Sequence, residues 1–267
     1  MITLMTDFGL VDPSVGACRG VLASLAPGVP LADIGHDVPA YDIERGARHL
    51  EYAVPYYPPG TIHVAVVDPG VGTTRRGVAL RSVRGDTLIG PDNGLLMWAA
   101  DALGGIEIAV ELLEDTYRLH PVSHTFHARD VFCPAAAHMA RGVAIEAFGP
   151  QLDVSSLRRV KREAPTVGDG EVSAPVATIS AFGNCHFDVL ESHWREAGLT
   201  GQETVVVQAD GHRWTLPYRL TFGDVTDGSA LLLEDSFGRL CLAVNQGDAR
   251  AMFGLKRGIP VRFSRVR

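Results

Sequence analysis

The sequence predicts an α/β protein whose N-terminal layered domain contains a mostly parallel sheet and whose smaller C-terminal domain is an antiparallel β-barrel or sandwich. Up to about residue 150, short apolar runs alternate with helical stretches, a pattern typical of a parallel sheet covered on both faces. Residues 151–170 are polar and contain a proline and a Gly-Asp-Gly turn, and the remainder reads as strands separated by turns. We therefore expect an N-terminal domain over 1–155, a linker over 156–170 and a C-terminal domain over 171–267.

The elements expected in the N-terminal domain follow from hydrophobic periodicity. Apolar runs predict strands at 2–8, 30–35, 61–68, 77–83 and 106–112. Helical stretches lie between or after these strands, at 14–26, 42–54, 93–103 and 129–143. In the C-terminal domain, strands are expected at 172–179, 203–210, 212–220, 230–237, 239–245 and 259–266.

Composition narrows the range of functions. The 267-residue chain is 46% hydrophobic and 21% charged, with a formal net charge of -7, which is ordinary for a globular protein. Its longest basic cluster is a short run at 158–162, so we expect no nucleic acid partner, because phosphate binding requires a concentrated positive face. No apolar run approaches the roughly 18 residues of a membrane span, and no signal sequence is apparent, so we expect a cytoplasmic protein without a membrane partner.

The four cysteines are widely spaced and form no CxxC pair, so we expect buried free thiols rather than a disulfide scaffold or a zinc site. Two common phosphate-binding motifs, GxGxxG and GxxxxGK[ST], are also missing. The recognition of a nucleotide-like ligand would therefore have to use other residues.

Acidic residues follow the first predicted strand. Asp7 lies at its carboxyl end, where ligands gather in α/β sheets and where a carboxylate can accept two hydrogen bonds from a ribose diol. Asp12 and Ser14 lie on the same rim, just before a predicted helix. For all three residues, capping of a helix or a turn is the structural alternative.

The stretch DPGVGTTRR, at 68–76, follows the third predicted strand. Gly70 and Gly72 allow the backbone to bend tightly, so that Arg75 can fold back on Asp68 and hold its carboxylate in one orientation. The structural alternative is a salt bridge that stabilises the turn. The following GPDNGLL stretch, at 90–96, is expected to be a turn into a helix with Asn93 near the cap.

In HTFHARDVF, at 124–132, Asp130 suits the start of a helix, whereas His127 has no evident capping role. A metal site would need further ligands at helical spacing, such as HxxxH, which do not occur. A di-metal phosphoesterase that uses Asp7, Asp68, His124 and His127 remains an alternative.

The C-terminal domain offers residues suited to binding a base. In ISAFGNCHFD, at 179–188, Phe182 can stack on a ring and the amide of Asn184 can read an adenine edge, although a Gly-Asn turn is the structural alternative. Ser236 lies in a predicted hairpin turn, and Gln246 in the next bend.

Taken together, these motifs resemble one family. TDFG, DPGVGTTRR, IGPDNGLL, TFHARD, FGN and AVNQG occur in the order and spacing found in the S-adenosylmethionine hydroxide adenosyltransferases, and the resemblance runs from residue 2 to about 265. It implies hydrolysis of S-adenosyl-L-methionine to adenosine and L-methionine, kinship with fluorinating and chlorinating enzymes, and no metal or organic cofactor. It also implies a homotrimer with each active site between the N-terminal domain of one subunit and the C-terminal domain of the next.

The resemblance also implies roles for individual residues. Asp68, Arg75 and His127 would position and activate water. The residues implied at the ribose are Asp7 and the aromatic Tyr41, with the neighbouring Phe8; at the methionine end, Asp12, Ser14 and Ser236; and at the adenine, Phe182, Asn184 and the Gln246 backbone.

Two alternatives to hydrolysis are a halogenase and a non-catalytic sensor of adenosine or S-adenosylmethionine. As the resemblance implies, halogenating relatives lack the acid at the position of Asp68, which would repel an incoming halide. A sensor would have no use for a water-activating group. The chain departs from the family pattern at Ser180, where the family usually has an acid, and at Phe187 and Asp188, where it usually has Thr-Asn. We expect Asp188 to bind the methionine ammonium in place of the missing acid. The chain also has Ala128 where the family usually has glycine, and the methyl group of Ala128 would narrow the pocket.

Overall fold

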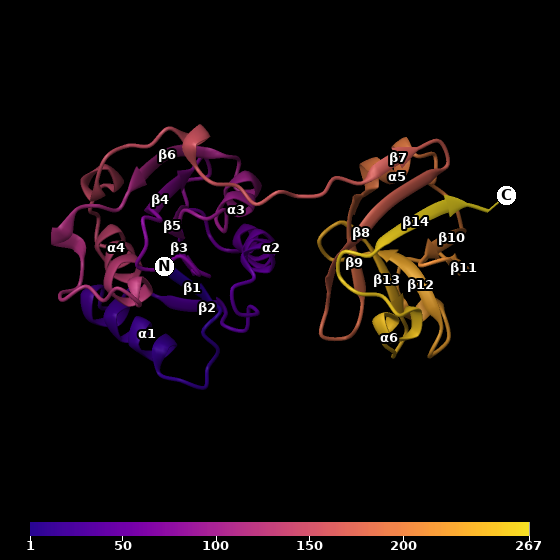
Figure 1. The fold of residues 1–267 in the computed structure, drawn as a ribbon, viewed down its shortest axis with the longest axis horizontal. Coiled ribbons are helices and arrows are strands. Elements are labelled where there is room, and N and C mark those ends of the chain that lie inside the picture. Colours follow the sequence, from indigo (N-terminus) through magenta and orange to yellow (C-terminus); the bar gives the residue numbers. More distant parts are fainter. Residues whose placement is uncertain (267) are drawn as a thin grey trace. The chain divides into compact units, whose positions relative to one another are not determined.

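The computed structural model describes residues 1–266. The chain forms two compact units, Met1–Val160 and a second unit that begins at Lys161 (Figure 1). The first unit is mixed α/β and the second is built on antiparallel strands, so the predicted fold class is confirmed. The extent of the linker over 156–170 stays a prediction. All four cysteines are buried and free, as predicted.

The first unit is organised around a six-stranded sheet. Along the sheet the strands are β2 (Leu31–Gly35), β1 (Ile2–Thr6), β3 (Ile62–Val66), β5 (Thr87–Pro91), β4 (Gly77–Ser82) and β6 (Ile106–Glu111). The first four run parallel, and β4 pairs antiparallel with both β5 and β6. The carboxyl ends of β1 and β3 therefore lie side by side at one edge of the sheet.

Helices cover both faces of this sheet (Figure 1). On one face, Leu4 of β1 belongs to a core that includes residues of α1 (Ser14–Leu25) and α4 (Cys133–Ala140). On the other face, Met5 belongs to a core with α2 (Ile43–Ala53) and α3 (Met97–Ala102). Because successive side chains of a strand point to opposite faces, a strand covered on both sides reads as an unbroken apolar run.

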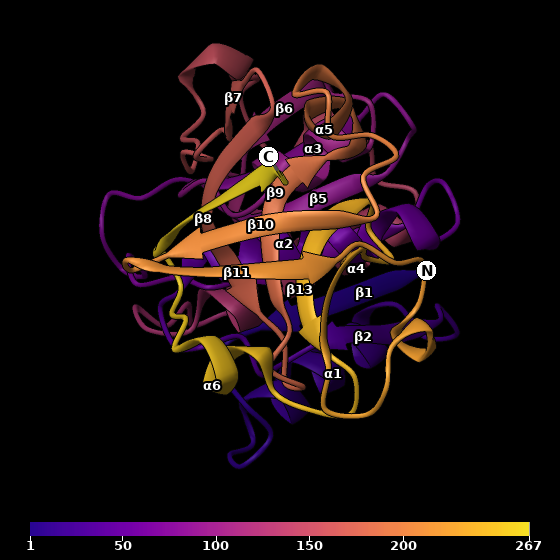
Figure 2. The ribbon, with the colours of Figure 1, turned by 90° about the vertical axis from the view of Figure 1, so that its right-hand side faces the viewer.

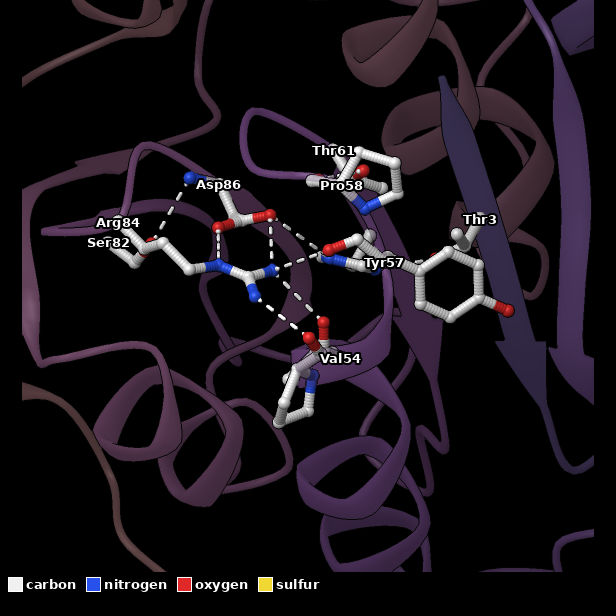
Figure 3. Close-up of polar contacts among 10 residues, drawn as sticks. Thr3, Val54, Tyr57, Pro58, Thr61, Ser82, Arg84 and Asp86 are labelled. Atoms are coloured by element: carbon white, nitrogen blue, oxygen red, sulfur yellow. Dashed lines mark hydrogen bonds and ion pairs between the residues drawn. The ribbon is translucent and has the colours of Figure 1, made fainter.

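A buried polar cluster lies near the amino ends of the parallel strands, away from the carboxyl edge (Figure 3). Thr3 Oγ1 lies 2.8 Å from His63 Nδ1, and Asp86 Oδ1 lies 3.6 Å from His63 Nε2. Arg84 pairs with Asp86 and donates to the backbone carbonyls of Val54, Pro55 and Tyr57. The cluster ties the segment after α2 to the sheet. Burial lowers the pKa of His63 to about 4.

The second unit contains an eight-stranded antiparallel sheet (Figure 2). Its strands are β7 (Thr166–Gly168), β8 (Glu171–Ile179), β9 (Cys185–Leu190), β10 (Thr204–Ala209), β11 (His212–Pro217), β12 (Ala230–Glu234), β13 (Arg239–Val244) and β14 (Pro260–Arg265). A bridge between Tyr218, just after β11, and Leu232 of β12 joins the two ends of the strand order, which gives a barrel-like closure. Phe187, Trp194 and Phe263 pack in its core.

Within residues 1–266, three strands (β5, β7 and β9) and two short helices were not among the predicted elements. Strand β5 ends in Gly90-Pro91, and strand β9 directly follows the Gly183-Asn184 turn. Because these residues are typical of turns, the sequence pattern did not predict a strand at either place. The short helices are α5 (Glu191–Glu196) and α6 (Ala249–Phe253). Over residues 1–266, no helix is long and apolar enough to cross a membrane.

Candidate active site

A pocket of about 210 Å³ opens at the carboxyl edge formed by β1 and β3. Asp7 directly follows β1, and Asp68 comes two residues after β3, so the parallel pairing of these strands brings both carboxylates to the same pocket. The residues that line it are Asp7, Phe8, Ala40, Tyr41, Val66, Asp68, Val71, Thr125, Phe126, His127 and Ala128. Asp7, Asp68 and His127, which stand in three separate motifs, are thus brought together with Phe8 and Tyr41, which the family resemblance implied.

The loop after β3 is folded tightly enough to return Arg75 to Asp68. Gly72 has a φ of 74°, and a Cβ atom at this position would clash with the His124 carbonyl oxygen. The Thr73 hydroxyl donates to the Gly70 carbonyl at 2.7 Å and accepts a hydrogen bond from the Arg75 amide at 3.3 Å. Only glycine fits at position 72, because the loop lies directly against the segment that carries His127.

Arg75 contacts both Asp68 and His127. Its Nε donates to Asp68 Oδ1 at 3.0 Å, and its Nη2 donates to Asp68 Oδ2 at 2.5 Å. The same Nη2 lies 3.0 Å from His127 Nδ1. A guanidinium group can only donate, so His127 Nδ1 accepts this bond and the proton of the neutral imidazole is on Nε2. The Asp68 and Arg75 side chains are only 5% and 8% exposed, so the pair is shielded from solvent.

Burial has opposite effects on the two titratable groups of this cluster. It raises the pKa of Asp68, and the positive charge of Arg75 opposes that rise. Burial and then Arg75 lower the pKa of His127, which keeps this imidazole neutral at pH 7. The cluster therefore presents a carboxylate with increased basicity next to a neutral imidazole.

Asp7 and Tyr41, which also line the pocket, are joined by a hydrogen bond. The Tyr41 amide donates to Asp7 Oδ2 at 2.9 Å, and Tyr41 has a φ of 67°, which is unusual for a bulky residue. In the described part of the chain, Asp7 Oδ1 receives no hydrogen bond, so this oxygen is available to a ligand hydroxyl group. Phe8 packs edge-on against Phe126, with ring centroids 5.9 Å apart, and closes one side.

Asp12 and Ser14 lie outside the pocket lining. Asp12 Oδ1 accepts a hydrogen bond from the Ser14 amide at 2.8 Å at the start of α1, where both residues lie near the surface. This contact is the capping-type turn given above as the structural alternative. The structure does not bring these two residues to the 210 Å³ pocket.

The residues predicted to bind the base lie in the second unit. Asn184 closes a turn between β8 and β9, where its backbone N–H donates to the Ser180 hydroxyl at 3.2 Å, and Phe182 is 81% exposed. The Arg250 amide donates to the Gly183 carbonyl at 2.9 Å, which ties this turn to the segment after Gln246. A solvent-exposed aromatic ring such as that of Phe182 is suited to stacking on a base.

Ser236 lies in the turn between β12 and β13. The preceding Asp235 accepts hydrogen bonds from the Phe237 and Arg239 amides at 2.8 and 3.0 Å, and its other oxygen lies 2.7 Å from His186 Nδ1. These contacts hold the Ser236 backbone in one conformation.

Two departures from the family pattern can be placed in the structure. Asp188 is nearly buried in β9 and forms an ion pair with Arg239 at 3.6 Å. This pairing argues against the expected contact with the methionine ammonium. If Asp188 turned away from Arg239, the Arg239 cation would remain buried without a partner, which is strongly destabilising. Ala128 lines the pocket beside His127, and the narrowing effect of its methyl group stays a prediction.

Phe126, Thr125 and Ala40 line the pocket but were not predicted as site residues. Phe126 could have been predicted, because it directly precedes His127 in the TFHARD motif. Ala40 was undetectable, because it reaches the pocket through the fold of the loop after β2. Within residues 1–266, no three side chains of the His, Cys, Asp or Glu type converge to hold a metal ion.

The fold and the pocket define an α/β protein with a polar ligand site at the carboxyl edge of its parallel strands, followed by an antiparallel β unit. The family model for the SAM hydroxide adenosyltransferase N-terminal domain matches residues 2–149, and the model for the C-terminal domain matches residues 174–262, where SAM is S-adenosylmethionine. The chain belongs to this family, and the resemblance read from its motifs is confirmed.

Individual relatives cover almost the whole chain. An (R)-S-adenosyl-L-methionine hydrolase of Salinispora tropica is 43% identical over 96% of this chain and 95% of its own length. A hydrolase of the same name from Thermus thermophilus is 40% identical, with 98% of each chain covered. A fluorinase of an Actinoplanes species is 29% identical over 98% of this chain and 96% of its own.

Solved structures show the same fold. A conserved protein from Thermotoga maritima matches with a TM-score of 0.93 at 30% identity, covering 99% of this chain and all of its own. A conserved protein from Thermus thermophilus matches with a TM-score of 0.75 at 37% identity, covering 98% of each chain.

Proposed function

We propose that the protein hydrolyses S-adenosyl-L-methionine to adenosine and L-methionine by attack of water at ribose C5′. The observation that carries the proposal is a pocket lined by Asp7, His127 and Asp68, in which Arg75 contacts both the Asp68 carboxylate and His127. The names of the 40–43% identical relatives support the same reaction.

The chemistry of a sulfonium substrate suits this set of residues. The sulfur departs as a neutral thioether, so no acid is needed at the leaving group. The protein must instead exclude bulk water and hold one oxygen atom roughly 3 to 3.5 Å behind C5′, in line with the breaking bond. Asp7 would fix the ribose by accepting hydrogen bonds from its diol, which places C5′ relative to Asp68.

The hydrogen-bond directions assign different tasks to Asp68 and His127. The Asp68 carboxylate accepts a hydrogen bond from the attacking water and takes its proton as the carbon–oxygen bond forms and the carbon–sulfur bond breaks. His127 Nδ1 already accepts from Arg75, so its Nε2–H donates to the water oxygen and orients it. The proton then passes from Asp68 to solvent, which leaves adenosine, methionine and one released proton.

A halogenase and a sensor are less well supported. An ionised Asp68 in a dry pocket would repel a halide ion. A binding protein would gain nothing from a buried carboxylate whose basicity is increased by burial, because that arrangement costs stability.

The proposal extends to the rest of the substrate and to the assembly. Phe182, Asn184 and the Gln246 backbone would bind adenine, Tyr41 would flank the ribose, and Asp12, Ser14 and Ser236 would contact the methionine end. These residues lie in both units, which fits a homotrimer with active sites between subunits. We further propose a cytoplasmic enzyme that needs no metal or organic cofactor and has no nucleic acid or membrane partner.

Product analysis tests the proposed reaction. The purified protein is incubated with each sulfur epimer of S-adenosyl-L-methionine, because the relatives are named for the R epimer. Chloride and a chelator are added to parallel samples. Adenosine and methionine in equal amounts, unchanged by chelator, are expected. A 5′-chloro product would favour a halogenase, and tight adenosine binding without turnover would favour a sensor.

A further inference from the structure

We infer that His36, acting through the Thr6 hydroxyl, is a positioning residue for Asp7. The inference rests on the proposed function, in which Asp7 binds the ribose diol. It concerns four side chains outside the pocket lining, namely Arg19, Asp33, His36 and Thr6, which we call the Thr6 relay.

The relay runs from the surface to the first residue of the TDFG motif. Arg19 pairs with Asp33, whose Oδ1 lies 3.0 Å from His36 Nε2. His36 Nδ1 lies 2.9 Å from Thr6 Oγ1, and the Phe8 amide donates to the same hydroxyl oxygen at 3.2 Å. His36 is 5% exposed and Thr6 is fully buried, so water does not substitute for these contacts.

The charge of Asp33 stabilises the outer end of the relay. Burial alone would raise the pKa of Asp33, but the contacts with Arg19 and His36 outweigh it and hold the pKa below its usual value. The ionised Asp33 faces His36 Nε2 in an ion-pair contact that lacks the geometry of a hydrogen bond. At the inner end, the Thr6 oxygen accepts from the Phe8 amide and contacts His36 Nδ1, so it joins the residue after Asp7 to the segment that follows β2.

The same segment reaches the Asp7 loop at two further points. The Gly9 amide donates to the His36 carbonyl at 2.7 Å, and the Tyr41 amide donates to Asp7 Oδ2. Residues 36–41 therefore hold residues 6–9 before, at and after Asp7. This arrangement fixes the direction of the free Asp7 oxygen, Oδ1.

A purely structural role would not need this chemistry. A buried histidine and threonine are costly to desolvate, and an apolar pair of similar size would stabilise the sheet at least as well. What the polar contacts add is a defined orientation of the backbone that carries Asp7. The relay should therefore affect how well the protein recognises the ribose hydroxyl groups, in addition to its effect on stability.

Comparison of adenosine with 2′-deoxyadenosine isolates that effect. Thr6→Val keeps the side-chain shape but leaves the Phe8 amide and His36 Nδ1 without the hydroxyl. We expect calorimetry to show adenosine binding about 10-fold weaker, the effect of one lost, well-oriented hydrogen bond, and the preference for adenosine over 2′-deoxyadenosine to shrink toward one. Thr6→Ser, which retains the hydroxyl, should keep the wild-type preference.

Two further variants guard against a folding defect. Asp33→Asn removes the charge at the exposed end of the relay and should lower the preference in the same direction, whereas Asp37→Asn, a nearby surface change outside the relay, should not. In an Asp7→Asn background, Thr6→Val should change the preference no further, because the positioned carboxylate is gone.

The outcomes separate this inference from the proposed function. If Thr6→Val and Asp33→Asn melt at lower temperature but keep the wild-type preference, the relay is structural only and the inference is overturned. If the wild-type protein itself binds both nucleosides equally, the assignment of Asp7 to the ribose fails, and the inference fails with it.

Discussion

The direction of the Arg75–His127 hydrogen bond determines which residue takes the proton from water. Because Arg75 only donates, it occupies the lone pair of His127 Nδ1, and a neutral imidazole then has no free acceptor. In the proposed reaction the general base is therefore Asp68, whose pKa is raised by burial, and His127 serves as a donor. Protonation of His127 would place a second donor against Arg75 and disrupt the cluster.

This assignment predicts the pH dependence of hydrolysis. Burial raises the pKa of Asp68 from its usual 3.8, whereas burial and then Arg75 lower the pKa of His127 from its usual 6.5. Activity should therefore be retained at neutral pH and fall on the acidic side of neutrality, because Asp68 becomes protonated and His127 becomes charged. Initial rates from pH 4.5 to 8.5 test it; an acidic transition centred above pH 7 would contradict it.

Most single site residues were predictable because each stands in a motif with unusual chemistry. Asp7, Asp68, Arg75 and His127 are polar residues that follow apolar strands or precede a helix, where a binding or catalytic role competes with a structural one. His36 could not be found in this way. Its partner Thr6 is 30 positions away in the sequence, and only the parallel pairing of β1 with β2 brings the two together.

At the level of elements, the loop between β3 and β4 is the most constrained segment of the site. Gly72→Ala would force a methyl group against the His124 carbonyl and strain a positive φ. We expect a loss of about 1 to 3 kcal/mol in the free energy of unfolding, with reduced hydrolysis, measured by denaturant unfolding and initial rates.

Gly85→Ala is the matched control for this change. Gly85 has a φ of 93°, but a Cβ atom there meets nothing within 4 Å. This variant should show the cost of the backbone strain alone and keep full activity. Equal activity in both variants would mean that the contact with His124 does not fix the loop.

The buried cluster at the amino end of the sheet predicts how stability depends on pH. The pKa of His63 falls from 6.5 to about 4 on folding, so the unfolded chain binds the proton more readily. Stability should thus be complete above pH 6.5 and decline as the pH falls toward 4, by an amount on the order of 3 kcal/mol from this residue. Urea unfolding at several pH values tests this, and the slope should be smaller in His63→Gln.

Elements with strong periodicity were predicted, whereas those interrupted by turn residues were not. Strands β1 and β3 are mostly apolar runs that the sheet buries on both faces. Strand β5 is equally buried but contains Gly90, where a side chain would clash with the Ala65 carbonyl. The glycine reads as a turn signal in the sequence, although its function is to let two neighbouring strands approach.

For the whole molecule, the proposed site residues are divided between two units with separate cores. Asp68 lies in the first unit and Asn184 in the second. The structural class of each unit was predictable from the order of the predicted elements, because alternating strands and helices are followed by strands alone. The homotrimer was implied only by the family resemblance, because the residue pattern of this sequence does not indicate how many subunits assemble.

Mixed assemblies test whether active sites form between subunits. Asp68→Ala and Asn184→Ala subunits should each be inactive or nearly so. If each site combines the first unit of one subunit with the second unit of the next, random mixed trimers should restore about a quarter of the sites. Activity after co-refolding equal amounts, with the mass of the assembly checked by light scattering, measures this. No recovery in verified mixed trimers would indicate that each site lies within one chain.

The most direct measurement follows the oxygen atom from water to product. S-adenosyl-L-methionine is incubated with the protein in ¹⁸O-water, and adenosine is analysed by mass spectrometry, for the wild-type chain and for Asp68→Asn. We predict one ¹⁸O atom at the 5′ position with the wild-type protein. The variant should bind adenosine normally but form product at about one hundredth of the wild-type rate or below, as expected for loss of a general base. Unlabelled adenosine, or undiminished hydrolysis by Asp68→Asn, would contradict water attack directed by Asp68.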